Sequence, residues 1–299
     1  MYFNKINIWF LFSLLVSIFV AIPIVTVFTS FFEDTSNYYQ ILKDTFLFEY
    51  IFNSLILLVG VLVLTFFIGT STAYLVSFYK FPLSNFFKWA LILSFAVPPY
   101  IYAYSLTAFF ENYGTLYSIL KNVFGEANYN QSIPKFDGLI GAVLSLSFSL
   151  FAYVYILSRA SFQYQSQNLI DLGRNLGFSK KKSFYSLILP AARPAIVAGL
   201  SLVAMETLAE FGAVDFFSIN TLTTGIYNSW ITFDDLAFSN RISFFLLLFI
   251  FAVFILENLS RKRQGIIQIQ KVDLNKKKKF NFQEQKRFMH FQFVLLFSF

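Results

Sequence analysis

Two carboxylates stand in an otherwise apolar stretch of this chain. Glu206 and Glu210 are four residues apart, so on a helix they would share one face. A carboxylate at membrane depth is costly, and it usually faces a cavity or a partner rather than lipid. The pair could therefore bind a cation or relay protons along a path through the membrane, or it could pair with Arg or Lys from another chain. The alternative, which the residues leave open, is that both only hold the fold at a helix contact or at the outer interface.

Enzymatic chemistry has few candidate residues in this sequence. The chain has no Cys and a single His, His290, to which we assign no role. This excludes zinc sites of the Cys/His type, disulfides and thiol catalysis, and it leaves no His-based acid and base pair. No Gly-x-x-x-x-Gly-Lys-Ser/Thr phosphate loop occurs either. We therefore predict that the chain is not an enzyme, that it binds no cofactor of its own and that it carries no metal site we can name.

A second regular pattern lies in residues 159–194, a segment longer than a connection between helices needs to be. Leu169, Leu172 and Leu176 recur at spacings of three and four residues, which predicts a short helix with one apolar stripe. Gly177 supplies the position at which such a helix ends in a left-handed turn.

A second short helix is predicted after Gly177. It carries Phe184, Leu187 and Ile188 on a similar stripe, and it is expected to stop at Pro190, whose ring cannot continue a helix. The apolar stripes of both helices must be covered by something. The residues are compatible with two surfaces that could bury these stripes. One is the membrane surface, which the lysines at 180–182 would touch, and the other is a cleft in a soluble partner protein.

The elements that hold these residues are predicted to be membrane helices. The chain is 57% hydrophobic and 13% charged, whereas a soluble domain has roughly 45–50% and 25%. A bilayer core about 30 Å thick needs about 20 apolar residues in a helix. Six runs meet this length, at 8–29, 51–78, 89–110, 139–157, 195–216 and 238–259. The expected fold is therefore an all-α integral membrane protein with six transmembrane helices.

Two local features refine these spans. The small residues at 69–73 in the second span predict a close contact with a neighbouring helix. Pro98 and Pro99 interrupt the third span, where we expect a kink near an interface, with a gating hinge as the alternative.

The positions of Lys and Arg predict the orientation, because positive charge in short loops marks the cytoplasmic side. With the N-terminus inside, every Lys and Arg except Lys43, Lys121, Lys135 and Arg241 falls in a cytoplasmic segment. The N-terminus, the segment 159–194 and the stretch after the sixth span are therefore expected in the cytoplasm. This topology accounts for the net charge of +7 without a nucleic-acid partner.

The segment 171–194 resembles the EAA loop of permease subunits from ATP-binding-cassette (ABC) importers. That loop reads Glu-Ala-Ala, three residues, Gly, and later Ile-x-Leu-Pro. Asp171 stands at the Glu position, Leu172 and Gly173 stand at the Ala positions, and Gly177 matches the Gly. The second part follows at the correct interval, with the residues Leu187, Leu189, Pro190 and, further on, Pro194. Asp in place of Glu and the loss of both Ala are departures from the pattern.

The resemblance implies a fold and a set of partners. The fold would be the ABC importer permease (MetI-like) type, formed by residues 1–260, with 159–194 as the coupling loop. Asp171 to Gly177, including Leu176, would seat in the ABC ATPase subunits, which bind the ATP. A periplasmic substrate-binding protein, a second permease half or homologous subunit, and the lipid bilayer of a bacterial inner (plasma) membrane would complete the assembly.

The fifth span carries a second resemblance, which concerns the substrate. The stretch 205–217, followed by Thr-Thr-Gly-Ile-Tyr at 223–227, resembles ferric iron importer permeases. This implies that ferric iron passes Glu206 and Glu210. Thiamine, phosphonate and polyamine permeases of the same group are also similar. The alternative from a different class of transporter is an ion-coupled secondary carrier that uses the same two carboxylates.

The last residues of the chain, 261–299, change from polar and basic to apolar. Residues 261–287 are polar and basic, as expected of a cytoplasmic linker, and 288–299 are apolar again but too short to span. The resembling ferric permeases carry two six-span halves in one chain. We therefore expect 288–299 to be the truncated start of a seventh span, or alternatively a C-terminus that lies in the interface.

Overall fold

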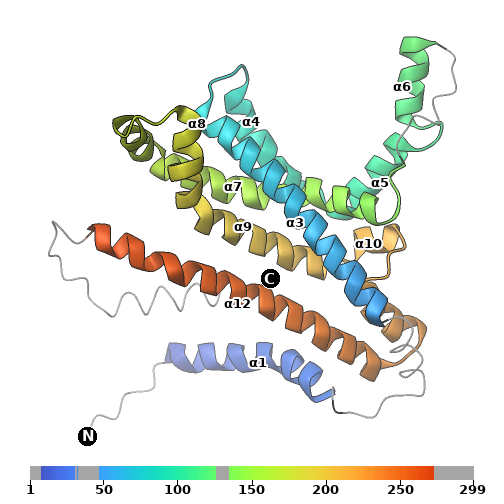
Figure 1. The fold of residues 1–299 in the computed structure, drawn as a ribbon. Helices are drawn as coiled ribbons and strands as arrows, with labels where there is room; N and C mark the ends of the chain where they lie inside the picture. Colours follow the sequence, from blue (N-terminus) through green and yellow to red (C-terminus); the bar gives the residue numbers. More distant parts are fainter. Residues whose placement is uncertain (1–7, 31, 33–46, 126–134, 273–299) are drawn as a thin grey trace, which may run out of the picture. The chain divides into compact units, whose positions relative to one another are not determined.

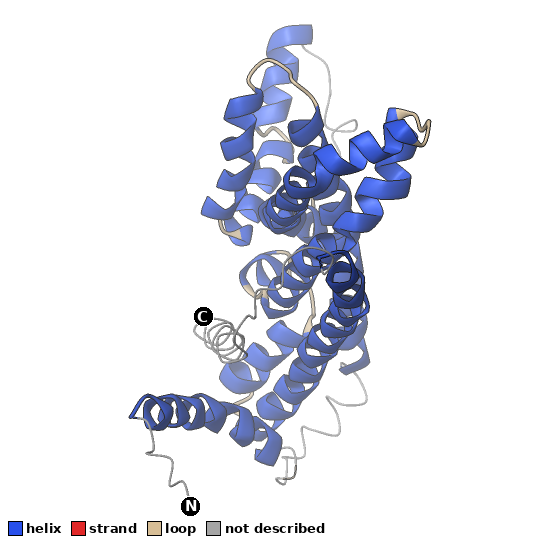
Figure 2. Cartoon of the chain, turned by 90° about the vertical axis from the view of Figure 1, so that its left-hand side faces the viewer, coloured by secondary structure: helices blue, strands red, loops and turns tan. Residues whose placement is uncertain are grey.

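The computed structural model describes residues 8–30, 32, 47–125 and 135–272, and all regular structure in these ranges is helical (Figure 2). The α-helices are α1 Ile8–Ser30, α3 Leu47–Phe78, α4 Ser84–Ala90, α5 Pro99–Phe110, α6 Thr115–Phe124, α7 Gly138–Asn175, α8 Lys180–Ser183, α9 Leu189–Ala209, α10 Gly212–Phe216, α11 Leu222–Tyr227 and α12 Leu236–Val272. A 3-10 helix, η1, covers Leu91–Ala96, and two π-helices cover Phe184–Ile188 (η3) and Asn228–Thr232 (η4). His290, most of the predicted linker and the predicted seventh span lie outside the described residues.

The described helices include five that are long and apolar enough to cross a membrane, and a sixth crossing if one bent pair counts as a span. The five are Trp9–Ser30, Leu47–Phe78, Gly138–Tyr164, Lys181–Ala209 and Leu236–Leu259. An all-helical membrane fold is therefore confirmed at this coarser level.

The predicted third span is not one helix. Ser84–Ala96 and Pro99–Phe124 meet at an angle of 100° on either side of Pro98. The physical reason is that two consecutive prolines remove two backbone donors, and Val97 is held in extended geometry before them. The kink predicted at this point is present.

The predicted fifth span ends earlier than expected. α9 stops at Ala209, and Glu210 has an extended backbone before the short helix α10. The run 195–216 was therefore wrong as a single helix, because the apolar composition continues past the point at which the backbone turns.

The chain divides into two units, Thr35–Arg261 and a second unit of Met1–Asp34 with Lys262–Phe299. In the first unit α3, α7 and α9 pack against one another (Figure 1). Their contact is close because Gly69 of α3 and Gly199 of α9 both lie against Val154 of α7. A Cβ added to Gly199 would lie 2.9 Å from the Val154 Cα atom. The small-residue contact predicted in the second span is confirmed.

The first part of α12 belongs to this same unit. Phe238 and Ile242 form a buried cluster with Tyr50 of α3 and Leu222 of α11. Further along, side chains of α12 pack on a second cluster made by Leu58, Ala204 and Leu208. α12 continues to Val272, so the first residues of the predicted linker are helical.

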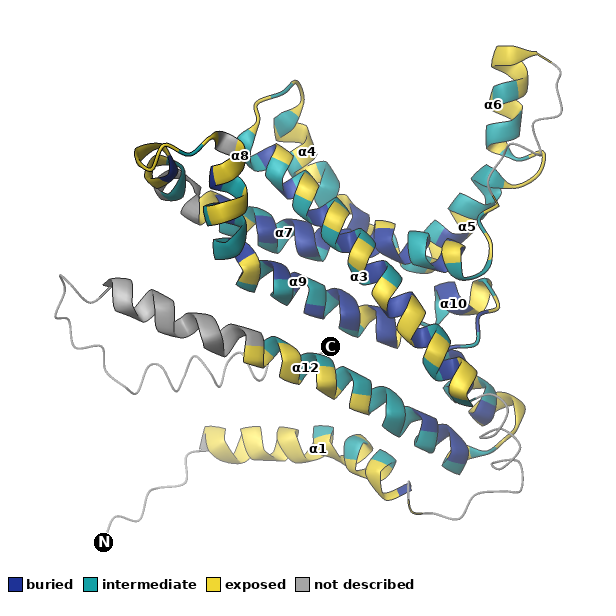
Figure 3. Ribbon diagram, in the orientation of Figure 1, coloured by how far each residue is buried: buried dark blue, intermediate teal, exposed yellow. Residues whose placement is uncertain are grey.

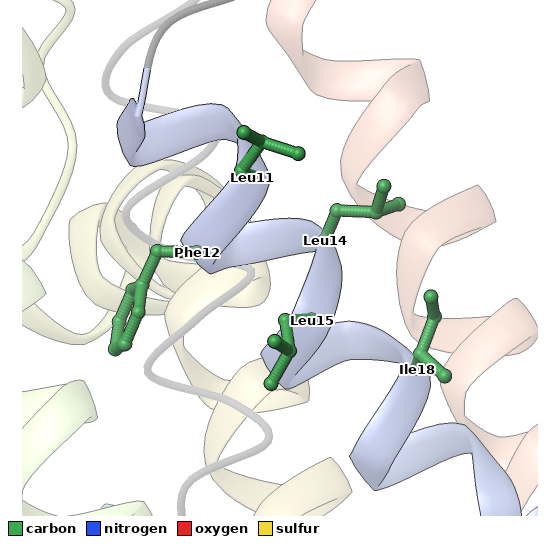
Figure 4. Close-up of a pocket in the computed structure, with 5 residues that line it drawn as sticks. All are labelled: Leu11, Phe12, Leu14, Leu15 and Ile18. Carbon is green, nitrogen blue, oxygen red and sulfur yellow. The ribbon is translucent and has the colours of Figure 1, made fainter.

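α1, in the other unit, is apolar and mostly exposed (Figure 3). Leu11, Phe12, Leu14, Leu15 and Ile18 line a hollow on its surface, and every one of these side chains is a hydrocarbon (Figure 4). Such a surface offers no hydrogen bond to a polar substrate, and it suits contact with lipid.

Candidate functional site

The predicted coupling segment begins inside a membrane helix. α7 runs without interruption from Gly138 to Asn175, so its last turns are the continuation of the fourth predicted span. The expectation of a separate short helix in a loop was wrong here, because no proline occurs between Leu157 and Gly177 and the helix continues through Gly173. We call Asp171–Gly177 the α7 tip.

The α7 tip ends as the sequence predicted. Gly177 has φ +71°, its N–H donates to the Arg174 carbonyl at 2.9 Å, and the Phe178 N–H donates to the Gly173 carbonyl at 2.8 Å. This is the Schellman arrangement, which satisfies the last carbonyls of a helix and favours glycine at the left-handed position. The left-handed turn predicted at Gly177 is confirmed.

Gly173 fixes the α7 tip against the next helix. It is buried, and a Cβ at this position would lie 2.3 Å from the Ser183 Oγ atom and 2.9 Å from the Ser183 Cβ atom. Only glycine allows this approach. Gly173 stands at the second of the two positions where the motif has Ala. Leu172 stands at the first of these positions, and its side chain is 43% exposed.

The outer face of the α7 tip is left uncovered. Leu176 is 55% exposed, beside exposed Leu172, Asp171 and Asn175. Asp171 and Arg174 form an ion pair at 3.6 Å, in which both side chains are exposed. Such a pair contributes little to stability. The tip is thus rigid in its backbone and open on its surface.

The second half of the motif is a continuous helix, which corrects the predicted stop at Pro190. α8, the π-helix η3 and α9 follow one another, and Pro190 lies in the first turn of α9. The N–H of Leu189 bonds to the Phe184 carbonyl in the wider π-turn. Because the first turn of an α-helix needs no donor from proline, the extra residue of the π-turn accommodates the ring.

Leu187, Leu189, Pro190 and Pro194 are half-buried, so they do not extend the open face of the α7 tip. Phe184 anchors the π-helix in an aromatic cluster, with ring centroids 4.2 Å from Tyr74 and 5.9 Å from Phe162. Sequence reasoning missed this cluster, because aromatic residues are so frequent in the chain that no single one stands out.

The two carboxylates have different surroundings. Glu206, on α9, is exposed, and it accepts a hydrogen bond from the Tyr153 hydroxyl at 3.3 Å. The ring of Tyr153 in turn packs edge to face on Phe95 of η1, at 4.4 Å between centroids. Glu206 therefore remains a candidate for contact with a passing substrate.

Glu210 directly follows the span that ends at Ala209, and it holds the chain where the backbone turns. Its Oε1 atom accepts from the Ala213 N–H at 2.8 Å, and its carbonyl accepts from the Thr223 hydroxyl at 2.7 Å. Burial raises the pKa of the Glu210 carboxyl above its usual value. The hydrogen bonds from the N–H groups of Ala213 and Gly212 lower the pKa, but each of these effects is smaller than that of burial. These contacts support a structural role for Glu210, and the two residues do not share one helix face.

No metal site was predicted, and the described part of the chain contains no group of three or more His, Cys, Asp or Glu side chains arranged to hold an ion.

The family model described as "Binding-protein-dependent transport system inner membrane component" matches residues 65–265. An Fe(3+)-transport system permease protein of Haemophilus influenzae is 26% identical over 208 residues, which are 70% of this chain and 36% of that protein. A molybdate/tungstate permease protein of Thermococcus kodakarensis is 24% identical over 66% of this chain and 71% of its own.

A sulfate transport system permease protein of Salmonella typhimurium is 24% identical over 51% of this chain and 52% of its own. The chain thus spans about a third of the ferric relative and half of the sulfate relative. Among solved structures, a bacterial ABC transporter for alginate import superposes with a TM-score of 0.64 at 14% identity, over 85% of this chain and 96% of that one. This likeness confirms the fold.

The family match covers well over half of the chain, and it includes both the α7 tip and the two carboxylates. Its members are transport subunits and not enzymes themselves. The chain belongs to the family of inner membrane components of binding-protein-dependent transport systems.

Proposed function

We propose that the chain is the membrane-spanning permease subunit of an ABC importer, with the α7 tip as its docking point on the ATPase subunits. One observation carries this proposal: the motif residues form a tip whose backbone is locked by Gly173 and Gly177, while Leu172 and Leu176 stay uncovered. An apolar surface that is fixed in place suits a partner with a matching cleft. ATP binds to the partner, and this chain holds no cofactor.

The assembly follows from the same proposal. A periplasmic binding protein delivers the substrate, and a second permease half or homologous subunit completes the path through the bacterial inner membrane. One alginate transporter of the same fold was solved in complex with a periplasmic protein that holds its ligand, which supports this arrangement. The bent pair Ser84–Ala96 and Pro99–Phe124 acts as the third of six crossings, and both ends of the six-span unit face the cytoplasm.

We assign ferric iron as the substrate. The ferric relative and the Thr-Thr-Gly-Ile-Tyr stretch after the fifth span support this choice. Exposed Glu206 offers a hard oxygen ligand, which suits a hard cation in transit. Glu210 contributes to the path only by holding the turn beside Glu206.

An oxyanion such as sulfate or molybdate is the second candidate, because relatives that transport these anions match the chain almost as well. A carboxylate on the path would repel an anion, whereas it would attract a cation. The charge of Glu206 therefore separates the two candidates.

The test is uptake into proteoliposomes that contain the whole complex and its binding protein. We expect uptake of radiolabelled ferric iron that requires ATP, is abolished by vanadate and is insensitive to uncouplers. Glu206→Gln should lower iron uptake, whereas Glu111→Gln, which changes an exposed carboxylate elsewhere, should not.

Two results would contradict the proposal in different ways. Uptake that uncouplers abolish would indicate an ion-coupled carrier and exclude the proposal of an ABC importer. Sulfate or molybdate uptake that is equal or higher in Glu206→Gln, together with no iron uptake, would keep the importer and replace the substrate.

A further inference from the structure

Three side chains of α7 donate hydrogen bonds to the carbonyls of Lys88 and Val97, which lie on either side of the 3-10 helix η1. The Ser149 hydroxyl donates to the Val97 carbonyl at 3.0 Å. The Tyr155 hydroxyl and the Arg159 Nη1 atom both donate to the Lys88 carbonyl, at 3.3 and 3.4 Å. We call Ser149, Tyr155 and Arg159 the α7 clamp.

Both carbonyls lie where the helical hydrogen bonds of the bent span change. Lys88 is in the last turn of α4, and helix ends leave such carbonyls without an intrahelical donor. Val97 is followed by two prolines, and the Ile101 N–H, which a continuous α-helix would direct to Val97, donates to the Pro98 carbonyl at 3.0 Å. A carbonyl at such a break costs free energy in an apolar surrounding unless a donor reaches it, and the side chains of α7 supply donors to both of these carbonyls.

Two residues of the α7 clamp are buried, and the third, Arg159, is half-buried. Ser149 is 3% exposed, and Tyr155 has no exposed surface. Two other buried serines of α7, Ser145 and Ser147, instead donate to carbonyls of their own helix, at 3.0 and 2.6 Å. The clamp bonds are therefore directed contacts between elements, which ordinary serines of this helix do not make.

α7 joins the clamp to the α7 tip as one uninterrupted helix, from Gly138 to Asn175. η1, on the other side, ends at the 100° bend of the broken span. We infer that the α7 clamp makes η1 move with α7, so that displacement of the α7 tip reaches the bent span. Ser149, Tyr155 and Arg159 are positioning residues of the transport cycle. This inference rests on the proposed function for its consequence, but the rigid link is a property of the chain alone.

The rigid link between η1 and α7 is tested by the distance between two spin labels, one in each helix. The chain has no Cys, so spin labels placed at Leu93→Cys in η1 and Tyr164→Cys in α7, both exposed positions, are unique. We expect one narrow distance distribution in the reconstituted complex, unchanged between the resting and vanadate-trapped states. Adding Ser149→Ala and Tyr155→Phe should broaden it, whereas Ser147→Ala should not. A distribution that is broad without the clamp variants, or one that they leave narrow, overturns the inference.

The consequence is tested by the amount of substrate imported per ATP hydrolysed. For Tyr155→Phe combined with Arg159→Gln we expect this ratio to fall about fivefold or more, while ATP hydrolysis is retained. Arg159→Lys, which keeps a donor, should restore much of it. Uptake and hydrolysis that fall in parallel would indicate a merely structural contact and overturn the inference. Absence of ATP-dependent uptake by the unmutated complex would overturn the proposed function, and the distance measurement would still decide the link.

Discussion

At the scale of single residues, the two glycines of the α7 tip do different work. Gly177 supplies a backbone conformation with positive φ, and nothing surrounds the position of a Cβ there. Gly173 has ordinary helical geometry, and it supplies space for Ser183. The motif therefore combines one conformational and one steric requirement within five residues.

Gly173→Ala tests the steric requirement. The added methyl group would overlap the Ser183 side chain, so we expect α8 to move from α7 at a cost of about 1–3 kcal/mol. The measurement is the melting temperature of the purified complex, together with ATP hydrolysis stimulated by the binding protein. Both should fall in the single variant and partly recover in Gly173→Ala with Ser183→Gly, because the second change removes the overlapping atoms. A single variant that matches the unmutated protein would refute the contact.

The sequence predicts Gly177 well and Gly173 poorly, for a physical reason. A left-handed helix end is a local event, which the neighbouring apolar spacing already indicates. The contact between Gly173 and Ser183 joins two different helices, and the bond from the Thr223 hydroxyl to the Glu210 carbonyl joins residues 13 apart, so neither is visible in spacing alone.

At the scale of elements, the apolar runs predict where helices lie, but the prolines mislead about where they end. Pro190 does not stop a helix, because the π-helix η3 adds a residue just before it. Pro98 and Pro99 do more than kink the third span, because its two parts meet at 100°. Proline is a local signal, and its outcome depends on whether the neighbouring turns can adjust.

The packing of α9 on α7 gives a prediction at this scale. A methyl group on Gly199 would meet backbone atoms, with the Val154 Cα at 2.9 Å and the Tyr153 carbonyl oxygen at 3.2 Å. A methyl group on Gly60 would meet only side-chain methyls of Val143, at 3.0 and 3.1 Å. Gly199→Ala should therefore lower the melting temperature in detergent more than Gly60→Ala. Equal shifts would contradict the close backbone contact.

At the scale of the whole molecule, the account depends on which side of the membrane each loop faces. The distribution of Lys and Arg predicts that the α7 tip and the N-terminus lie in the cytoplasm. The absence of Cys makes this directly testable, because one introduced thiol is the only one in the chain.

Single thiols at Lys181→Cys and Asn122→Cys, both exposed positions, test the orientation. A membrane-impermeant maleimide should label the thiol at 122 in intact spheroplasts, and the thiol at 181 only after the membrane is opened. The opposite pattern would invert the topology and remove the α7 tip from the side that holds ATP.

The central claim, that the α7 tip couples this chain to ATPase subunits, is tested most directly at Leu176. A charge at this exposed position should not disturb folding, but it should prevent an apolar contact with the partner. The measurement is ATP hydrolysis by the reconstituted complex with and without its loaded binding protein. We predict that Leu176→Asp inserts normally and loses stimulation by about tenfold or more, while Leu176→Met keeps it. Stimulation by Leu176→Asp at the level of the unmutated complex would contradict the account.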